Sequence, residues 1–141
     1  MPRAICMFCL LTALLLASYL PASAFGWFPP CGSPEVHASI ISRFNAAYTR
    51  AIHDGASIRN ISGDREHVYE AFGRSPILRR YCKAEAWMNH RPHKPHRLYY
   101  RIEERMGLAG IGWKVEFCVP GHDNWRVFNG DCRVLRKPYL R

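Results

Sequence analysis

The sequence predicts an α+β fold, in which one N-terminal amphipathic helix packs on an antiparallel sheet of four to five strands. Apolar residues recur every three to four positions between residues 34 and 55, which is typical of a helix with one buried face. Apolar and polar residues then alternate in short segments between residues 80 and 132, as in strands with one face on a core and one in water. Four cysteines beyond residue 24 add two predicted disulfides.

The first 24 residues have the pattern of a secretory signal peptide. Arg3 precedes an apolar run from Ile5 to Leu20, and Ala22-Ser23-Ala24 is a small-x-small cleavage site. The proline at position 21 and the small residues that follow it disfavour the alternative, an uncleaved membrane anchor. We therefore expect a periplasmic or secreted protein with a single α+β domain over residues 25–141.

The predicted helix begins at Ser33, where a hydroxyl N-cap precedes Pro34 and an acid, Glu35. It is expected to end near Gly55. One face is apolar and comprises Val36, Ile40, Phe44, Ala47, Tyr48 and Ile52. The opposite face carries Arg43, Asn45, Thr49 and Arg50, which we expect only to be solvated.

The segment between the helix and the alternating region is less regular. Residues 57–61 fit a short strand, and Ser62-Gly63-Asp64 fits a turn. Residues 65–72 fit either a short helix or a strand. Residues 73–76 contain glycine and proline and are expected to break the chain.

Four alternating segments follow, at residues 81–88, 97–104, 113–119 and 125–128. Residues 89–96 would connect the first two, and the glycine-containing residues 106–112 would connect the next two. The side chains expected to face the core are Cys82, Ala84, Ala86, Met88, Leu98, Tyr100, Ile102, Trp113, Val115, Phe117 and Val119. Tyr81, Trp87 and Tyr99 are expected to lean into solvent, and Cys118 to point away from the core.

The cysteines left after signal cleavage, which would remove Cys6 and Cys9, are Cys31, Cys82, Cys118 and Cys132. Three pairings are possible. We favour Cys118 with Cys132, because the intervening residues fit strand, turn and strand, which brings their ends together. This leaves Cys31 with Cys82. Without a Cys-x-x-Cys pair among these four, zinc binding by cysteine is disfavoured.

The chain is basic, with a formal charge of +9. Signal cleavage would remove one arginine, Arg3, and no acid, which leaves +8. This charge favours an anionic partner, and nucleic acid, lipid, glycan and acidic protein all stay open. The residues that concentrate charge at one end of the predicted sheet are Arg79, Arg80, Lys83, Arg91, Lys94, Arg97 and Arg101.

The most conspicuous cluster lies in residues 89–97, where three histidines follow one another at three-residue spacing. Imidazoles bind zinc, copper or nickel, so a metal-binding histidine loop is one alternative. Two prolines and three cations in the same segment favour a solvated basic loop. The predicted binding patch combines this loop with two aromatic side chains: Arg91, His93, Lys94, His96, Arg97, Trp87 and Tyr99. We expect no cofactor.

An enzyme would need a base, a nucleophile or a paired acid. His122, Asp123 and His96 are candidates for general acid-base chemistry, and a small basic disulfide protein of this kind could be a secreted hydrolase such as a ribonuclease. Without a motif to support this alternative, the sequence favours a non-enzymatic binding protein.

Several segments resemble a group of small, secreted proteins of alpha-proteobacteria that have no assigned activity. They are residues 80–84, 98–103, 112–123 and 131–133, within a similarity that covers residues 58–133. The resemblance implies a periplasmic location and disulfides. The order of one helix followed by antiparallel strands also resembles the cystatin-like and NTF2-like plans. The cystatin motif Gln-x-Val-x-Gly is absent, so protease inhibition is not implied.

Overall fold

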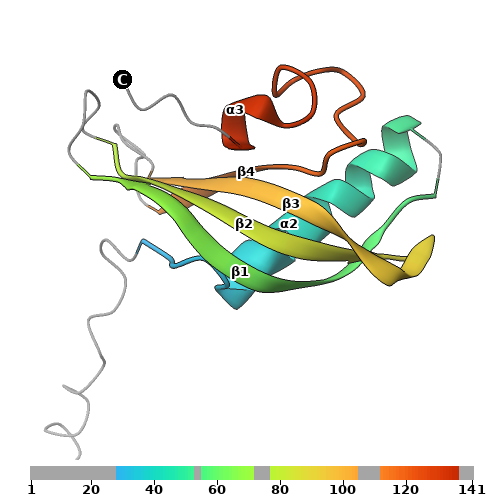
Figure 1. The fold of residues 1–141 in the computed structure, drawn as a ribbon, viewed down its shortest axis with the longest axis horizontal. Helices are drawn as coiled ribbons and strands as arrows, with labels where there is room; N and C mark the ends of the chain where they lie inside the picture. The colour runs from blue at the N-terminus through green and yellow to red at the C-terminus, as the bar shows by residue number, and fades with distance from the viewer. Residues whose placement is uncertain (1–27, 53–54, 72–76, 105–111, 137–141) are drawn as a thin grey trace, which may run out of the picture.

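The computed structural model describes residues 28–52, 55–71, 77–104 and 112–136. One helix packs on one face of a four-stranded antiparallel sheet, and two disulfides join the chain (Figure 1). The α+β plan is therefore confirmed. The helix begins at Pro34 and is not N-terminal in this chain. The elements in chain order are α2 (Pro34–Ala47), a π-helical turn η1 (Tyr48–Ile52), β1 (Ile58–Glu70), β2 (Arg79–Met88), β3 (Arg91–Glu104), β4 (Trp113–Cys118) and α3 (Arg133–Arg136).

Helix α2 uses its predicted apolar stripe. Val36, Ile40 and Phe44 are buried, and Tyr48 in η1 continues the stripe. Ala47 is exposed, so its assignment to the buried face was wrong. Pro34 occupies the first turn as expected, but Ser33 donates its hydroxyl to the carbonyl oxygen of Pro30 at 3.0 Å and does not cap the helix.

Two side chains expected only to be solvated instead fasten α2 to the sheet. Asn45 donates to the carbonyl oxygen of Ile58 at 3.1 Å and accepts from the amide of Ile58 at 2.8 Å. Arg43 donates to the carbonyl oxygen of Val115. The polar side of the helix therefore reaches both β1 and β4.

Strand β1 is one continuous strand, and the turn predicted at residues 62–64 is a bulge within it. The register shifts between Ser62 and Arg65, and Gly63 has φ of +68°, which glycine adopts without strain. The Asp64 carboxylate at this bulge accepts from the Tyr100 hydroxyl at 2.5 Å and lies 2.9 Å from Nε2 of His37. Burial, together with the hydrogen bond to Asp64, raises the pKa of Tyr100 well above its usual value of 10.

The predicted connection at residues 89–96 is mostly strand, so that prediction was wrong. Only Asn89 and His90 form the turn, because the Asn89 side chain accepts from the amides of Ser57 and His90, both at 2.9 Å. β3 then begins at Arg91. β4 pairs with β3 only from Tyr99 onwards. The two prolines of β3 therefore lie where its outer edge has no partner strand, a position that tolerates proline.

The fourth alternating segment, residues 125–128, is not a strand. Arg126, Asn129, Asp131 and Cys132 all have φ between 50° and 61°, in the left-handed region that a strand excludes. Asp123 stabilises the turn by accepting from the amide of Phe128 at 3.3 Å. The segment after β4 is therefore a series of turns that ends in α3.

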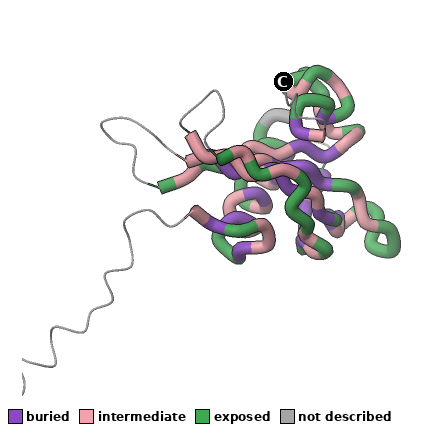
Figure 2. Tube along the Cα trace, turned by 60° about the vertical axis from the view of Figure 1, so that its left-hand side comes forward, coloured by how far each residue is buried: buried purple, intermediate pink, exposed green. Residues whose placement is uncertain are grey.

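The main core lies between α2 and the sheet, and Figure 2 shows buried residues along the strands and on the facing side of the helix. Every residue predicted to face the core from β2 and β3 does so. A smaller cluster lies on the opposite face and contains Tyr99, Cys118, Cys132 and Leu135. Cys118 therefore points away from the main core, as predicted.

Both predicted disulfides are present. Cys31–Cys82 fastens the segment before α2 to β2, and Cys118–Cys132 fastens α3 to β4. They close segments of 51 and 14 residues. Each contributes on the order of 3–4 kcal/mol to stability by restricting the unfolded chain.

The predicted signal peptide, the break at residues 73–76 and most of the glycine-containing connection lie outside the described residues. Within the described ranges, no helix has the length and apolar character needed to span a membrane.

Candidate anion-binding groove

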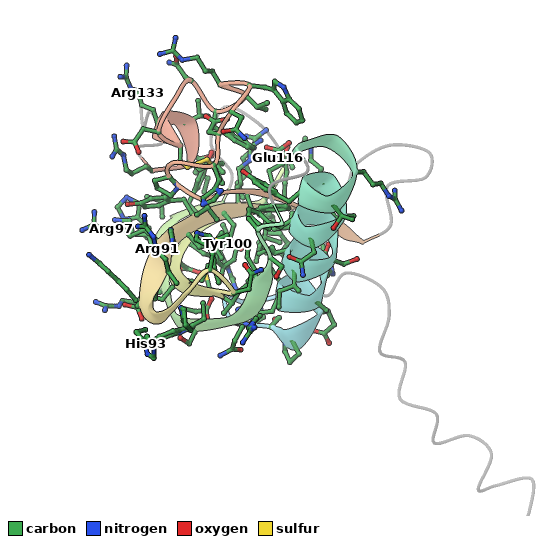
Figure 3. All side chains as sticks on the ribbon, turned by 90° about the vertical axis from the view of Figure 1, so that its right-hand side faces the viewer. Arg91, His93, Arg97, Tyr100, Glu116 and Arg133 are labelled. Carbon is green, nitrogen blue, oxygen red and sulfur yellow. A yellow bond between two sulfur atoms is a disulfide. The ribbon has the colours of Figure 1, made fainter. Side chains whose placement is uncertain are left out.

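The face of the sheet opposite α2, called here the outer face, carries part of the predicted patch, including Arg97 and Tyr99. Paired residues of antiparallel strands share a face, so the register of the sheet places side chains in rows. One row runs from Arg65 through Lys83 and Tyr99 to Cys118. The next row pairs Glu85 with Arg97. Figure 3 shows Arg97 on the side of the sheet away from α2, with Tyr100 between the sheet and the helix.

These rows enclose a hollow of about 290 Å³, called here the groove. Its lining residues are Gly63, Arg65, Lys83, Ala84, Glu85, Arg97, Leu98 and Tyr99. Three of them are cations and one is an acid, so the lining has a net positive charge. Arg65 and Arg97 are exposed and Lys83 is half-buried, so a partner can reach all three.

The three cations of the groove share one acid, Glu85, which lies opposite Arg97. Arg65 and Lys83 are directly opposite each other on β1 and β2, and like charges in that position destabilise a sheet. Among the ion pairs found within the described ranges, none includes Arg65, Lys83 or Arg97. The positive potential extends to His67, where partial burial and then the charge of Lys83 lower the pKa.

Three other cations, which were predicted to concentrate charge at one end of the sheet, are already paired with acids. Arg79 lies 3.3 Å from Glu103, and Arg101 lies 3.2 Å from the same carboxylate. Arg80 pairs with Glu66 at 2.8 Å. Because of these contacts, the end of the sheet that carries Arg79 and Arg101 does not offer free positive charge.

The aromatic residues that were expected to lean into solvent are less accessible than expected. Tyr99 is 5% exposed and Tyr81 is 6% exposed, so the expectation that they lean into solvent was wrong. Leu135 and Phe128, from the chain after β4, pack against the same cluster as Tyr99. Trp87 is half-buried and donates from its indole nitrogen to Ser62 at 2.9 Å. Stacking of nucleic-acid bases on Tyr99 therefore requires displacement of the segment after β4.

The remaining residues of the predicted patch separate into two groups. Arg91, His93 and Lys94 are exposed at the start of β3. His96 pairs with Ala86, whose side chain faces the main core, and therefore lies on the inner side of the sheet. Burial, followed by the charges of His90, Arg91 and Lys94, lowers the pKa of His96 from its usual value.

Sequence reasoning missed Arg65 as a groove residue. Its segment fitted either a helix or a strand, and only the register with β2 places it opposite Lys83. The alternation of β2 and β3 did place Lys83 and Arg97 away from the core. The missing signal was the bulge at Gly63, which changes the face of the residues that follow it.

The candidate acid-base pair lies elsewhere, beside a second hollow of about 270 Å³ between α2 and the segment after β4. The Asp123 carboxylate accepts from the Phe128 amide, and Nδ1 of His122 lies 3.1 Å from the Tyr48 hydroxyl. Asp123 thus has a structural contact that explains its position, and His122 is oriented by a residue of η1.

Comparisons of this chain with protein-family models, with curated proteins and with solved structures find no match. The proposed function therefore rests on the groove and its charges.

Proposed function

We propose that this chain is a non-enzymatic binding protein whose groove holds an anionic group of its partner. The observation that carries the proposal is the cross-strand pair of Arg65 and Lys83, joined by Arg97 around one hollow without an internal ion pair. This arrangement costs stability in the isolated chain. A bound anion offsets that cost by forming charge-assisted hydrogen bonds with the three side chains.

The size of the groove favours a phosphate or sulfate group on a larger carrier. A volume of about 290 Å³ is at the lower end of the range for small-molecule pockets. Beyond the groove, Arg91, His93 and Lys94 continue along β3 and are exposed. A polyanion with repeated phosphate or sulfate groups fits both the groove and these exposed residues, because one group enters the groove while others lie along the β2–β3 hairpin.

The proposal includes a periplasmic or secreted location. The signal-peptide pattern and the resemblance to secreted alpha-proteobacterial proteins support it, and the two disulfides are typical of an oxidising compartment. We likewise propose the cystatin-like or NTF2-like plan as the nearest architectural description, supported by one helix on an antiparallel sheet.

The test measures the affinity of the purified protein for inorganic polyphosphate at several salt concentrations. We expect the affinity to fall steeply as salt rises, since binding releases counterions. The variant Arg65→Gln/Lys83→Gln/Arg97→Gln should bind about tenfold or more weakly. The matched control Arg50→Gln/Arg59→Gln/Arg133→Gln removes three exposed cations from other places and should lose much less.

Equal losses in the two triple variants would show that only total charge matters and would refute a specific groove. The alternative function, a small hydrolase, makes a different prediction. Cleavage of RNA by the wild-type protein, lost in a His122→Ala variant, would replace the binding proposal.

A further inference from the structure

The hollow of about 270 Å³ between α2 and the segment after β4 has a different character from the groove. Figure 1 shows the segment between β4 and α3 beside the C-terminal half of α2. Within the described ranges, the hollow and the groove share no lining residue. We call this space the aromatic hollow, because five of its lining residues are aromatic: Phe44, Tyr48, Phe117, Trp125 and Phe128.

Part of the aromatic hollow is lined by rings that pack against one another. Phe44 and Tyr48 are buried and stack with their ring centres 4.2 Å apart and their planes inclined by 13°. The ring of His122 stands edge-on to both, with centres 5.8 Å from Phe44 and 5.3 Å from Tyr48. Rings held by such contacts form a surface that exists before any ligand arrives, as is usual in small-molecule sites.

Two further lining residues are apolar side chains that extend into solvent. Trp125 is 66% exposed and Val127 is 68% exposed. Arg126 between them has φ of 54°, a left-handed conformation that residues other than glycine rarely adopt. Residues held in such conformations cluster at ligand-binding segments. A ligand seated in the hollow would remove apolar surface of Trp125 and Val127 from water.

Asp123 adds an acidic group to this apolar lining. Within the described ranges, its carboxylate accepts from the Phe128 amide at 3.3 Å and takes part in none of the ion pairs found. Its two oxygens can accept further hydrogen bonds. A ligand that brings a cationic donor would satisfy this capacity.

The other acid and the arginine of the lining are engaged with the protein. The carboxylate of Glu116 contacts Arg101 and lies 3.5 Å from Nζ of Lys114. The guanidinium of Arg43 donates to a backbone carbonyl oxygen of β4 and lies 5.4 Å from the centre of an aromatic ring of the same strand. Asp123 is therefore the charged group that is best placed to meet a ligand.

We infer that the aromatic hollow binds a small aromatic amine, a molecule with one aromatic ring and a protonated amino group. The ring packs against the aromatic lining, and the ammonium group donates to the Asp123 carboxylate. The exposed face of Trp125 attracts the same cation. A volume of about 270 Å³ lies just below the usual range for drug-sized ligands, so a molecule of this size fits. This site goes beyond the proposed function, because its ligand is a cation.

The test titrates 2-phenylethylamine into the isotope-labelled protein and follows the backbone amides of residues 123–128 by NMR. We expect these amides to shift with saturation at one ligand per chain. Two matched probes each lack one feature: butylamine has no ring, and 3-phenylpropionate carries a carboxylate in place of the amine. Both should bind about tenfold or more weakly.

Two variants test the residues that carry the inference. Asp123→Asn keeps an oxygen that accepts from the Phe128 amide but removes the charge, and Trp125→Ala removes an exposed ring. Each should bind 2-phenylethylamine about tenfold more weakly. The matched controls Asp131→Asn and Val134→Ala change an exposed acid and an exposed apolar residue of the same part of the chain that do not line the hollow. They should keep the wild-type affinity, and near-ultraviolet circular dichroism checks each fold.

Unshifted amides at residues 123–128 of the wild-type protein would overturn the inference, as would equal or tighter binding of 3-phenylpropionate. Equal losses in Asp123→Asn and Asp131→Asn would show that only total charge matters and would also overturn it. The triple groove variant should bind 2-phenylethylamine as tightly as wild type, and Asp123→Asn should keep its affinity for polyphosphate. These two measurements separate this site from the proposed function.

Discussion

The two ends of the outer face use the same residue types in opposite ways. At one end, Arg79, Glu103 and Lys114 lie side by side on β2, β3 and β4, so charges alternate in sign across the strands. In the groove, Arg65 and Lys83 are neighbours of the same sign. Both arrangements are set by register. Charge counts alone therefore do not identify a binding surface, because the cations of the ion-paired end form ion pairs within the fold.

Glu103 is the acid at the centre of the ion-paired end. The side chain of Glu103 is 8% exposed and lies within 3.5 Å of nitrogen atoms of Arg79, Arg101 and Lys114. Although burial acts to lower it, contacts with Tyr81, Glu116 and Glu103 raise the pKa of Arg101. Attraction between opposite charges therefore stabilises the ion-paired end, whereas repulsion between Arg65 and Lys83 destabilises the groove.

The largest expected effect is on stability at the ion-paired end. Replacement of Glu103 by glutamine leaves three cations without their shared partner and should lower the free energy of unfolding by about 3 kcal/mol. The triple groove variant Arg65→Gln/Lys83→Gln/Arg97→Gln should change it by less than about 0.5 kcal/mol, or increase it, because repulsion is removed. Urea unfolding of the two variants measures both values. A larger loss in the groove variant would show that its cations are structural.

A smaller effect is expected at His67, beside the groove. Its pKa in the folded state is lowered from 6.5 by partial burial and by Lys83. The unfolded chain therefore takes up protons first, and the folded protein loses stability as the pH falls through 6.5. In Lys83→Gln the pKa of His67 should rise, and the loss of stability in acid should be smaller. NMR titration of the His67 ring measures the shift. An unchanged pKa would show that the positive potential of the groove does not reach His67.

Much of the fold follows from local patterns in the sequence. Alternation along β2 and β3 placed Cys82, Ala86 and Leu98 in the core, since every second side chain of a strand shares a face. The same alternation put Cys118 on the opposite face. The pairing of Cys118 with Cys132 is present, although the second strand that was expected to bring the two cysteines together is a series of turns.

Alternation failed where backbone conformation overrides side-chain pattern. Residues 125–128 alternate like a strand, yet Arg126 and Asn129 have positive φ and the segment forms turns. The burial of Tyr99 was also not predictable from the sequence, because Leu135 packs against this cluster only through the fold of the turns after β4.

The candidate sites depend on contacts between distant residues, which spacing does not reveal. Arg65 meets Lys83 because a bulge at Gly63 sets the register of β1. The ring centres of His122 and His96 lie 5.7 Å apart, although the two residues are far apart in the sequence. In both cases the residue types were visible in the sequence, and their juxtaposition was not.

The measurement that tests the central claim most directly is NMR mapping of inorganic polyphosphate binding on the isotope-labelled protein. The account predicts that the backbone amides of Gly63, Lys83 and Arg97 shift on titration, while those of Arg79 and Lys114 at the ion-paired end stay in place. Shifts centred on the ion-paired end, or spread evenly over both ends, would contradict it.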